Sequence, residues 1–459
     1  GLSSLGRSEP HVEATLTLVR SAVCAMAGDG WQPPISPGVG IDQGPELLRH
    51  RTQDLLGPEP RDRVTRIMVT LPSSAATNPA LVRELVERGM NIARINCAHD
   101  DPEAWRAMAG HVRRAAEATG QDCLIAMDLA GPKLRTGPLE PGPRSVKLRP
   151  HRNKLGKVIA PAQAWLTAAE DPTDPPETGM LSLPVSRQWL RRRQNGDVLH
   201  LHDTRGSKRR LVLKTGDTTS GTCGGFVVTA DKTTYLATGT ALHVHGTEDS
   251  TPLGELPQTE QSLLLHRGDI LELTRDCSPA SLAPNSFPRI GCTLPEIFDN
   301  ARVGEKVHLD DGRISGEIVS VNPSVLRLRI DHAADAGSRL RAGKGVNVPD
   351  ARLPLSALTD KDVSDLATVV ELADLVEMSF VRDPSDVEHL LEELNRLGDD
   401  ALGIVLKIET RQAFEHLPQL LLTVMRRPRV GVMIARGDLG VECGYERLAE
   451  LQEEILWLC

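Results

Sequence analysis

The chain has 459 residues, a formal net charge of −9 and only 3% aromatic residues. This length is too great for one ordinary core and favours two or three domains. The negative charge and the few aromatic side chains argue against nucleic acid or an anionic membrane as a partner, and no apolar run approaches the ~20 residues of a membrane span.

The eight cysteines are scattered and form no Cys-x-x-Cys pair. We therefore expect reduced thiols in a cytoplasmic protein, without a disulfide framework or a zinc site. The chain begins with Gly1 and ends at Cys459 inside a helical pattern. This pattern predicts a C-terminally truncated piece of a longer protein.

Residues 1–63 are predicted to form an N-terminal extension that is helical and irregular in turn. Apolar residues recur at helical spacing from His11 to Met26, residues 28–44 are rich in Gly and Pro, and a second helix is expected from Glu46 to Leu56. No catalytic pattern is evident in this extension.

Residues 64–137 are predicted to form the first part of a β/α barrel. Three apolar runs, residues 66–71, 90–96 and 123–128, read as strands. A helix capped by Asn78 and another beginning at Asp101 lie between them, each with proline at its first position. This alternation indicates parallel strands with right-handed crossovers.

Residues 138–343 change to short alternating runs with many turns, which predicts an inserted β-rich domain. Residues 196–203 resemble residues 304–311, and each segment is followed by a further β run. A duplicated or enlarged β module explains this similarity, and chance likeness of two hairpins is the alternative.

Residues 344–459 return to the α/β pattern and are predicted to form the second, truncated part of the barrel. A helix capped by Thr359 precedes a strand over 374–381, and a helix opened by Asp383 precedes strands over 403–409 and 430–438. The chain then has six strands, whereas a closed (β/α)8 barrel needs eight. The predicted fold class is α/β, a partial TIM (β/α)8 barrel with about six of eight units and an inserted all-β domain.

The last two strands carry charged residues where they end: Lys407, Glu409, Arg436 and Asp438. Sites in α/β barrels lie at the carboxyl ends of strands. Two carboxylates there can share a hard divalent cation, and the two cations can balance an anionic substrate. The alternative is a set of structural ion pairs at strand ends.

Seven motifs, in order, resemble the pyruvate kinase family. They cover roughly residues 64–137 and 302–459, the insertion only loosely, and the first 60 residues not at all. The motifs are residues 90–99 (MNIARINCAH), 128–137 (DLAGPKLRTG), 309–315 (LDDGRIS), 344–349 (KGVNVP), 379–382 (SFVR), 407–409 (KIE) and 435–440 (ARGDLG).

The resemblance implies phosphoryl transfer from phosphoenolpyruvate to ADP, giving pyruvate and ATP in glycolysis. It implies Mg²⁺, or Mn²⁺ in its place, at Glu409 and Asp438, and catalytic roles for Lys407 and Arg94. Substrate would be held by Arg94, Gly437 and Asp438. The nucleotide-binding positions would be Asn96, His99, Arg135 and Lys344. The insertion would be a lid, and the full-length protein a homo-oligomer.

The chain departs from the family pattern around the monovalent-cation region, formed by Asn96, Asp128 and Lys133. Potassium-dependent members use further side-chain oxygens where Ala98 and Leu129 lie, and carry Glu where Lys133 lies. Because an ammonium can stand in for a monovalent cation, we predict that K⁺ is not required.

Two other functions stay open at this point. A magnesium-dependent aldolase or lyase on a related barrel can also use a Lys-Ile-Glu segment with a downstream Asp. A pyruvate kinase homologue that binds without turnover is the other alternative.

Overall fold

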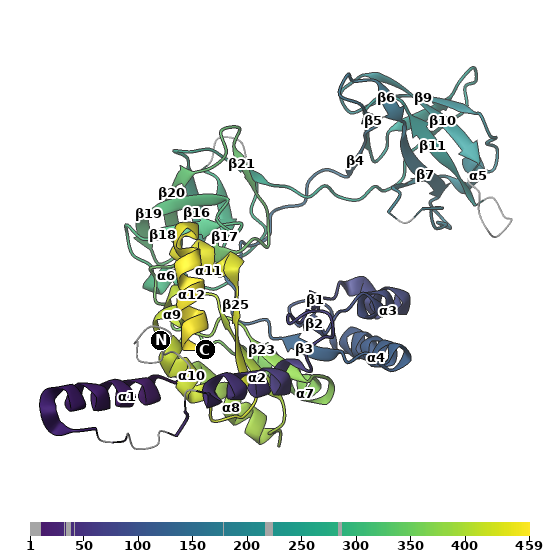
Figure 1. Ribbon diagram of the computed structural model, residues 1–459. Helices are drawn as coiled ribbons and strands as arrows, with labels where there is room; N and C mark the ends of the chain where they lie inside the picture. Colours follow the sequence, from purple (N-terminus) through teal and green to yellow (C-terminus); the bar gives the residue numbers. More distant parts are fainter. Residues whose placement is uncertain are drawn as a thin grey trace. The chain divides into compact units, whose positions relative to one another are not determined.

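The structure is a computed structural model that describes residues 11–31, 33, 38–40, 42–177, 179–215, 224–282 and 287–459 (Figure 1). The chain divides into two compact units. The first comprises residues 1–137, 264–278 and 285–459, and the second comprises residues 138–263 and 279–284. Each unit is described by itself.

The first unit contains a six-stranded sheet in which every neighbouring pair is parallel. This sheet is a partial (β/α)8 barrel, which confirms the predicted fold class. In spatial order its strands are β1 (Met68–Thr70), β2 (Ile92–Asn96), β3 (Leu124–Asp128), β23 (Leu375–Met378), β24 (Gly403–Ile408) and β25 (Val430–Ile434).

Helices follow the strands, and three of their predicted starts are confirmed by the caps. The Asn78 side chain accepts a hydrogen bond from Leu81 N, and Asp101 accepts one from Ala104 N. Thr359 forms a reciprocal capping box with Asp362. The helices are α3 (Pro79–Glu87), α4 (Pro102–Thr119), α7 (Asp360–Leu372), α8 (Pro384–Arg396), α9 (Arg411–Glu415), α10 (Leu417–Val424), α11 (Arg436–Cys443) and α12 (Leu448–Leu458).

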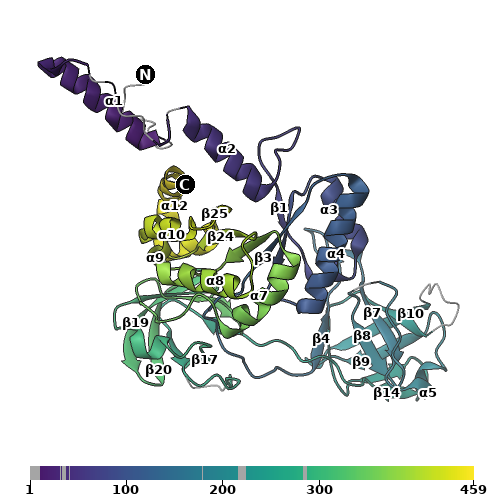
Figure 2. The same ribbon diagram turned by 90° about the horizontal axis from the view of Figure 1, so that it is seen from below.

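Alternate strand residues face opposite sides of this sheet. One set, including Ile95, Met127 and Val376, packs against the helices in the main core. The helices α3 and α4 lie side by side next to β1 in both views (Figures 1 and 2). The other set forms the inner face of the partial barrel.

The lower layer of the inner face is apolar and is sealed by a residue from the N-terminal extension. Ile92, Ala126, Leu375 and Val405 form a cluster with Leu55. Leu55 lies in α2 (Gln43–Leu56), the second of two expected helices after α1 (Val12–Cys24). This extension therefore contributes to the barrel core.

The strand predicted over 430–438 is too long. β25 ends at Ile434, and α11 begins at Arg436. Arg436, Gly437 and Asp438 thus lie in the first turn of a helix, where backbone N–H groups lack intrahelical partners.

The first unit also holds a mostly antiparallel sheet. Its strands, in spatial order, are β17 (Arg289–Gly291), β16 (Ile270–Thr274), β20 (Val325–His332), β19 (Ile314–Asn322), β18 (Lys306–Leu309) and β22 (Val346–Asn347). A short helix, α6 (Ile297–Asn300), precedes β18.

The second unit has its own hydrophobic core. The similar segments 196–203 and 304–311 each supply the first strand of an antiparallel hairpin, β9–β10 here and β18–β19 in the first unit. The strands of the main sheet are β14 (Ser250–Pro252), β13 (Ala241–Val244), β9 (Val198–His202), β10 (Lys208–Thr215), β11 (Gly225–Ala230), β7 (Ala162–Ala168) and β8 (Ser182–Val185).

The seven cysteines that the structure describes are free thiols, and Cys223 lies outside the described residues. Among the described helices, none is both long enough and apolar enough to cross a membrane.

Candidate active site

Polar residues replace apolar ones on the inner face toward the carboxyl ends of the strands. Arg94 follows Ile92, Asp128 follows Ala126, Glu377 follows Leu375 and Lys407 follows Val405, each two residues further along its strand. A spacing of two keeps the side chain on the same face. The sheet register pairs Asp128 with Glu377. The site is therefore built on strands, above an apolar floor.

Lys407 is held at the centre of this polar layer. Its Nζ lies 3.1 Å from Asp128 Oδ1 and 2.9 Å from Glu409 Oε1, and it donates to Ser379 Oγ at 2.8 Å. The side chain is buried. Burial acts to lower the pKa of Lys407, but the charges of Glu409 and Asp128 outweigh it and raise that pKa above the ordinary value. Lys407 is therefore a fixed, buried positive charge.

Glu409 lies directly beside this ammonium. Its Oε2 accepts a hydrogen bond of 2.8 Å from the backbone N–H of Phe380. Burial raises the pKa of Glu409, Lys407 opposes that rise, and the nearby charge of Asp438 adds to it. The repulsion between the two carboxylates is the electrostatic condition that a shared cation relieves.

Arg94 is anchored in three directions. Its Nε donates to Glu377 Oε2 at 2.9 Å and its Nη1 to Thr70 Oγ1 at 2.7 Å, while Nη2 donates to Asp128. Asp128 therefore joins the two cations, since it accepts from both Arg94 and Lys407.

Asp438 belongs to the first turn of α11 and is only partly buried. Its Oδ1 lies 3.2 Å from Lys133 Nζ, and that ammonium lies 5.7 Å from the centre of the Phe380 ring. Arg436 and Gly437 are exposed in the same turn. Lys133 therefore adds a third positive charge, after Lys407 and Arg94, at the edge of the site.

The donor set suits a hard divalent cation. Mg²⁺ is bound by one or two carboxylates together with water and substrate oxygens, and Glu409 and Asp438 offer two carboxylates. In the part of the chain that the structure describes, no group of three or more His, Cys, Asp or Glu residues could hold a metal alone. An ion held by Glu409 and Asp438 would complete its coordination with other oxygens, such as those of substrate and water.

The side chains of the four residues expected on the nucleotide side make no described hydrogen bond or ion pair with this network. Asn96 ends β2 and its Oδ1 accepts from Ala98 N, and the imidazole of His99 is exposed. Arg135 Nη1 donates to Gly343 O at 3.0 Å, and Lys344 Nζ lies 2.8 Å from Asp310 Oδ1. Arg135 and Lys344 therefore lie near each other, because Arg135 is also bridged to Gly345, the residue after Lys344.

Sequence reasoning missed Glu377 and Thr70, and it treated Ser379 only as part of a motif. Glu377 carried a signal, because it is the one charged residue in the apolar strand Leu375–Met378. A charge at such a position needs a partner. Its partner Arg94 lies 283 residues away in the sequence, so spacing could not identify it.

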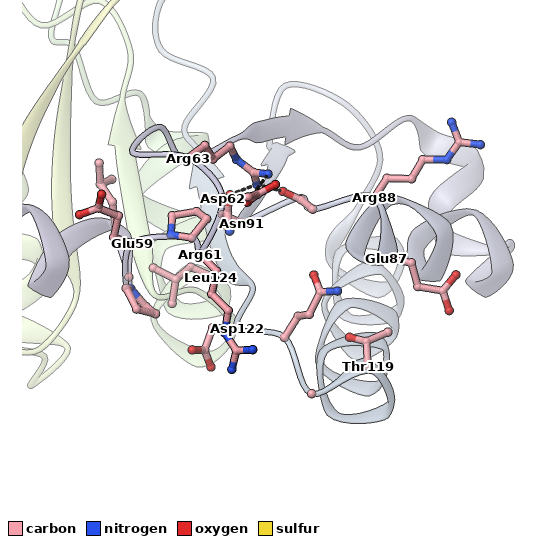
Figure 3. A pocket seen from close by; sticks show the side chains of 17 residues that line it. Glu59, Arg61, Asp62, Arg63, Glu87, Arg88, Asn91, Thr119, Asp122 and Leu124 are labelled. Atoms are coloured by element: carbon pink, nitrogen blue, oxygen red, sulfur yellow. Dashed lines mark hydrogen bonds and ion pairs between the residues drawn. The ribbon is translucent and has the colours of Figure 1, made fainter.

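A cavity of about 660 Å³ lies at the other end of β2 and β3, where Asn91 and Leu124 line it (Figure 3). There Arg63 donates to Asn91 Oδ1. Its charged lining residues are of both signs: Glu59, Arg61, Asp62, Arg63, Glu87, Arg88 and Asp122. The amino ends of barrel strands serve stability in enzymes of this architecture, so the carboxyl-end cluster is the better candidate.

A family model described as "Pyruvate kinase, barrel domain" matches residues 62–160 and 225–459. A pyruvate kinase of Clostridium perfringens is 30% identical over 196 residues, which cover 42% of this chain and 39% of that protein. A pyruvate kinase of Mycobacterium intracellulare is 22% identical over 392 residues, which cover 85% of this chain and 54% of that protein. Human pyruvate kinase PKLR is 31% identical over 227 residues, which cover 49% of this chain and 37% of that protein. The matches thus span 54% or less of the length of these relatives.

Proposed function

This chain belongs to the pyruvate kinase family, and on that premise we propose that it catalyses phosphoryl transfer from phosphoenolpyruvate to ADP. The products are ATP and, after proton uptake at the enolate carbon, pyruvate. We further propose that this reaction takes place in glycolysis, in the cytoplasm.

The observation that carries the proposal is the buried ammonium of Lys407 between Asp128, Ser379 and Glu409. Phosphoryl transfer passes through a transition state whose charge is spread over the equatorial oxygens. A preorganised cation in a buried site stabilises that charge without reorganisation during the reaction. Lys407 fits this role because burial and three partners fix its position.

Arg94 and the first turn of α11 supply the proposed substrate contacts. Arg94 grips the phosphate of phosphoenolpyruvate, and Gly437 and Asp438 face the substrate through backbone and carboxylate. Asn96, His99, Arg135 and Lys344 are proposed to contact the nucleotide. The basic character of Arg135 and Lys344 suits ADP phosphates.

Glu409 and Asp438 would hold Mg²⁺, or Mn²⁺ in its place. The ion supplies charge neutralisation to the transferring phosphoryl group. The two carboxylates contribute hard oxygen ligands, and their mutual repulsion supports a cation between them.

The test is a coupled assay of phosphoenolpyruvate, ADP and Mg²⁺ on the full-length parent protein and its Lys407→Met variant. We expect turnover in the parent and a loss of about 10²-fold or more in the variant, which is the usual scale for removing one electrostatic contact. Lys306→Met is the matched control, because Lys306 is also ion-paired, 2.8 Å from Asp331, but lies in the antiparallel sheet.

Absence of turnover from the folded parent protein would reject phosphoryl transfer. The lyase alternative would then be tested by pyruvate formation from a hydroxy-keto acid with Mg²⁺. Binding of phosphoenolpyruvate with Mg²⁺ but without either reaction would identify a binding protein.

A further inference from the structure

Glu377 is a buried carboxyl group that has no role in the proposed reaction so far. It is fully inaccessible to solvent, and its three neighbours in β23 are apolar. Removing a carboxylate from water costs several kcal/mol unless its hydrogen bonds are replaced. Only Oε2 has such a bond, to Arg94, whereas Oε1 has no hydrogen-bond partner among the described residues.

Stability alone gives a poor account of this arrangement. The register brings Glu377 beside Asp128, so two carboxylates share one guanidinium. Like charges at short range repel, and buried ion pairs are often no more stable than apolar residues of similar volume. The arrangement does, however, fix the orientation of a planar group.

The hydrogen bonds of Arg94 define that orientation. A guanidinium has five N–H donors in a rigid plane. Glu377 takes the Nε donor, Thr70 takes one on Nη1, and Asp128 takes one on Nη2. One donor remains on each terminal nitrogen, without an acceptor in the described structure. These two donors lie on the two terminal nitrogens, whose spacing matches two oxygens of a phosphate.

We propose that Glu377 is a positioning residue, which holds the Nε side of Arg94 so that its terminal edge faces the phosphate of the substrate. This inference rests on the proposed function for the identity of that phosphate. Without the acceptor at Nε, the guanidinium can rotate so that both Nε and a terminal nitrogen donate to Asp128. The terminal nitrogens would then no longer face the phosphate.

The first experiment compares Glu377→Gln with Glu377→Leu in the full-length protein. Gln keeps an oxygen that can accept from Nε, while Leu removes it at similar volume. We expect Glu377→Leu to raise the Kd for phosphoenolpyruvate with Mg²⁺, and its KM, at least tenfold with a smaller change in kcat. Glu377→Gln should bring both constants back to within about threefold of the wild-type values, because its amide oxygen still accepts the hydrogen bond from Arg94 Nε. A hydrogen bond to a charged group is among the stronger ones.

A second readout does not depend on turnover. In ¹⁵N-labelled protein, the Arg94 Nε–H resonance, assigned by its loss in Arg94→Lys, should be protected from solvent exchange. That protection should persist in Glu377→Gln and disappear in Glu377→Leu. If the parent protein proves inactive, the same variants can be titrated with inorganic phosphate, so failure of the proposed reaction is separated from failure of the positioning role.

Glu272→Gln and Glu272→Leu are the matched controls. Glu272 is also a buried carboxylate shared by two arginines, Arg289 at 2.8 Å and Arg327 at 3.0 Å, in the antiparallel sheet. Its variants should leave anion affinity unchanged. Tighter anion binding in both Glu377 variants would mean that Glu377 acts only by repulsion, and a fall in Tm with unchanged Kd would mean a purely structural pair. Either result overturns the inference, as does retained Nε–H protection in Glu377→Leu.

Discussion

Lys133 Nζ lies 3.2 Å from Asp438 Oδ1, so an ammonium is paired with a carboxylate that is expected to bind the divalent cation. The same ammonium lies over the Phe380 ring. Because this fixed charge can replace a monovalent cation, we expect the turnover rate to be the same in potassium and tetramethylammonium chloride. The turnover rate of Lys133→Glu should fall about tenfold or more without K⁺ and recover in part when K⁺ is added, as measured by the coupled assay.

The control for this prediction is Lys147→Glu in the second unit, where Lys147 likewise lies over an aromatic ring, 5.2 Å from the centre of Tyr235. It should show no potassium response. A wild-type rate that depends on K⁺, or a Lys133→Glu variant that ignores it, would contradict the substitution.

Glu377 should make stability depend on pH. Burial, and then the charge of Asp128, raises the pKa of Glu377 to about 7, against the opposing effects of Arg94 and Lys407. A carboxyl whose pKa is higher in the folded than in the unfolded state stabilises the fold at low pH, and that contribution is lost as pH rises through about 7. The unfolding free energy of the wild type should therefore fall relative to Glu377→Gln between pH 5 and pH 8.

At 1.36 kcal/mol per pKa unit, the upper bound of this effect is about 3 kcal/mol. Urea unfolding of both proteins at each pH measures it, and taking the difference removes titrations that the two proteins share. If the unfolding free energy of the wild type minus that of Glu377→Gln did not change with pH, or increased as pH rises, the raised pKa would be contradicted.

Local patterns predicted much of the barrel, because their causes lie within a few residues. Asn78, Asp101 and Thr359 cap helices through N–H groups three residues further on. Continuous apolar runs likewise identified strands buried on both faces. The end of β25 was misjudged, since an apolar run that continues into a helix does not reveal where the backbone changes conformation.

Long-range contacts could not be predicted in the same way. Nothing near Leu55 indicates that it seals the inner face of the sheet, and nothing near Glu377 points to Arg94. Within residues 138–343, short alternating strands occur throughout, so the sequence offered no boundary where the structure divides the chain, between Leu263 and Leu264. For the candidate site, the motifs identified Lys407 and Glu409, but the hydrogen bonds that fix them depend on the fold.

Asp128 is expected to be the most sensitive carboxylate of the site, because it accepts hydrogen bonds from Arg94, Lys407 and Ser379. Asp128→Asn keeps the shape but removes the charge that the buried Lys407 and the partly buried Arg94 share. Breaking a buried charge pair in this way typically costs about 3–5 kcal/mol. We expect a matching loss of unfolding free energy, measured by urea denaturation, together with loss of turnover.

Asp331→Asn is the comparison for that measurement, because Asp331 accepts from Lys306 and Ser315 but is less buried. Its cost should stay near the ~1 kcal/mol of an exposed ion pair. Equal losses in the two variants would show that the network around Asp128 has no special energetic role.

The contact between Leu55 and Gly431 gives a test of the floor beneath the site. A Cβ added to Gly431 would lie 2.5 Å from Leu55 Cδ2, too close for any real contact. Gly431→Ala should therefore destabilise the protein by about 1–3 kcal/mol through overpacking, and Leu55→Ala by about 2–5 kcal/mol through the cavity it leaves. In the double variant the new methyl group occupies part of that cavity, so its loss should be smaller than the sum of the two single losses. Urea unfolding of the four proteins measures this coupling, and strictly additive losses would show that Leu55 does not pack against the strand at Gly431.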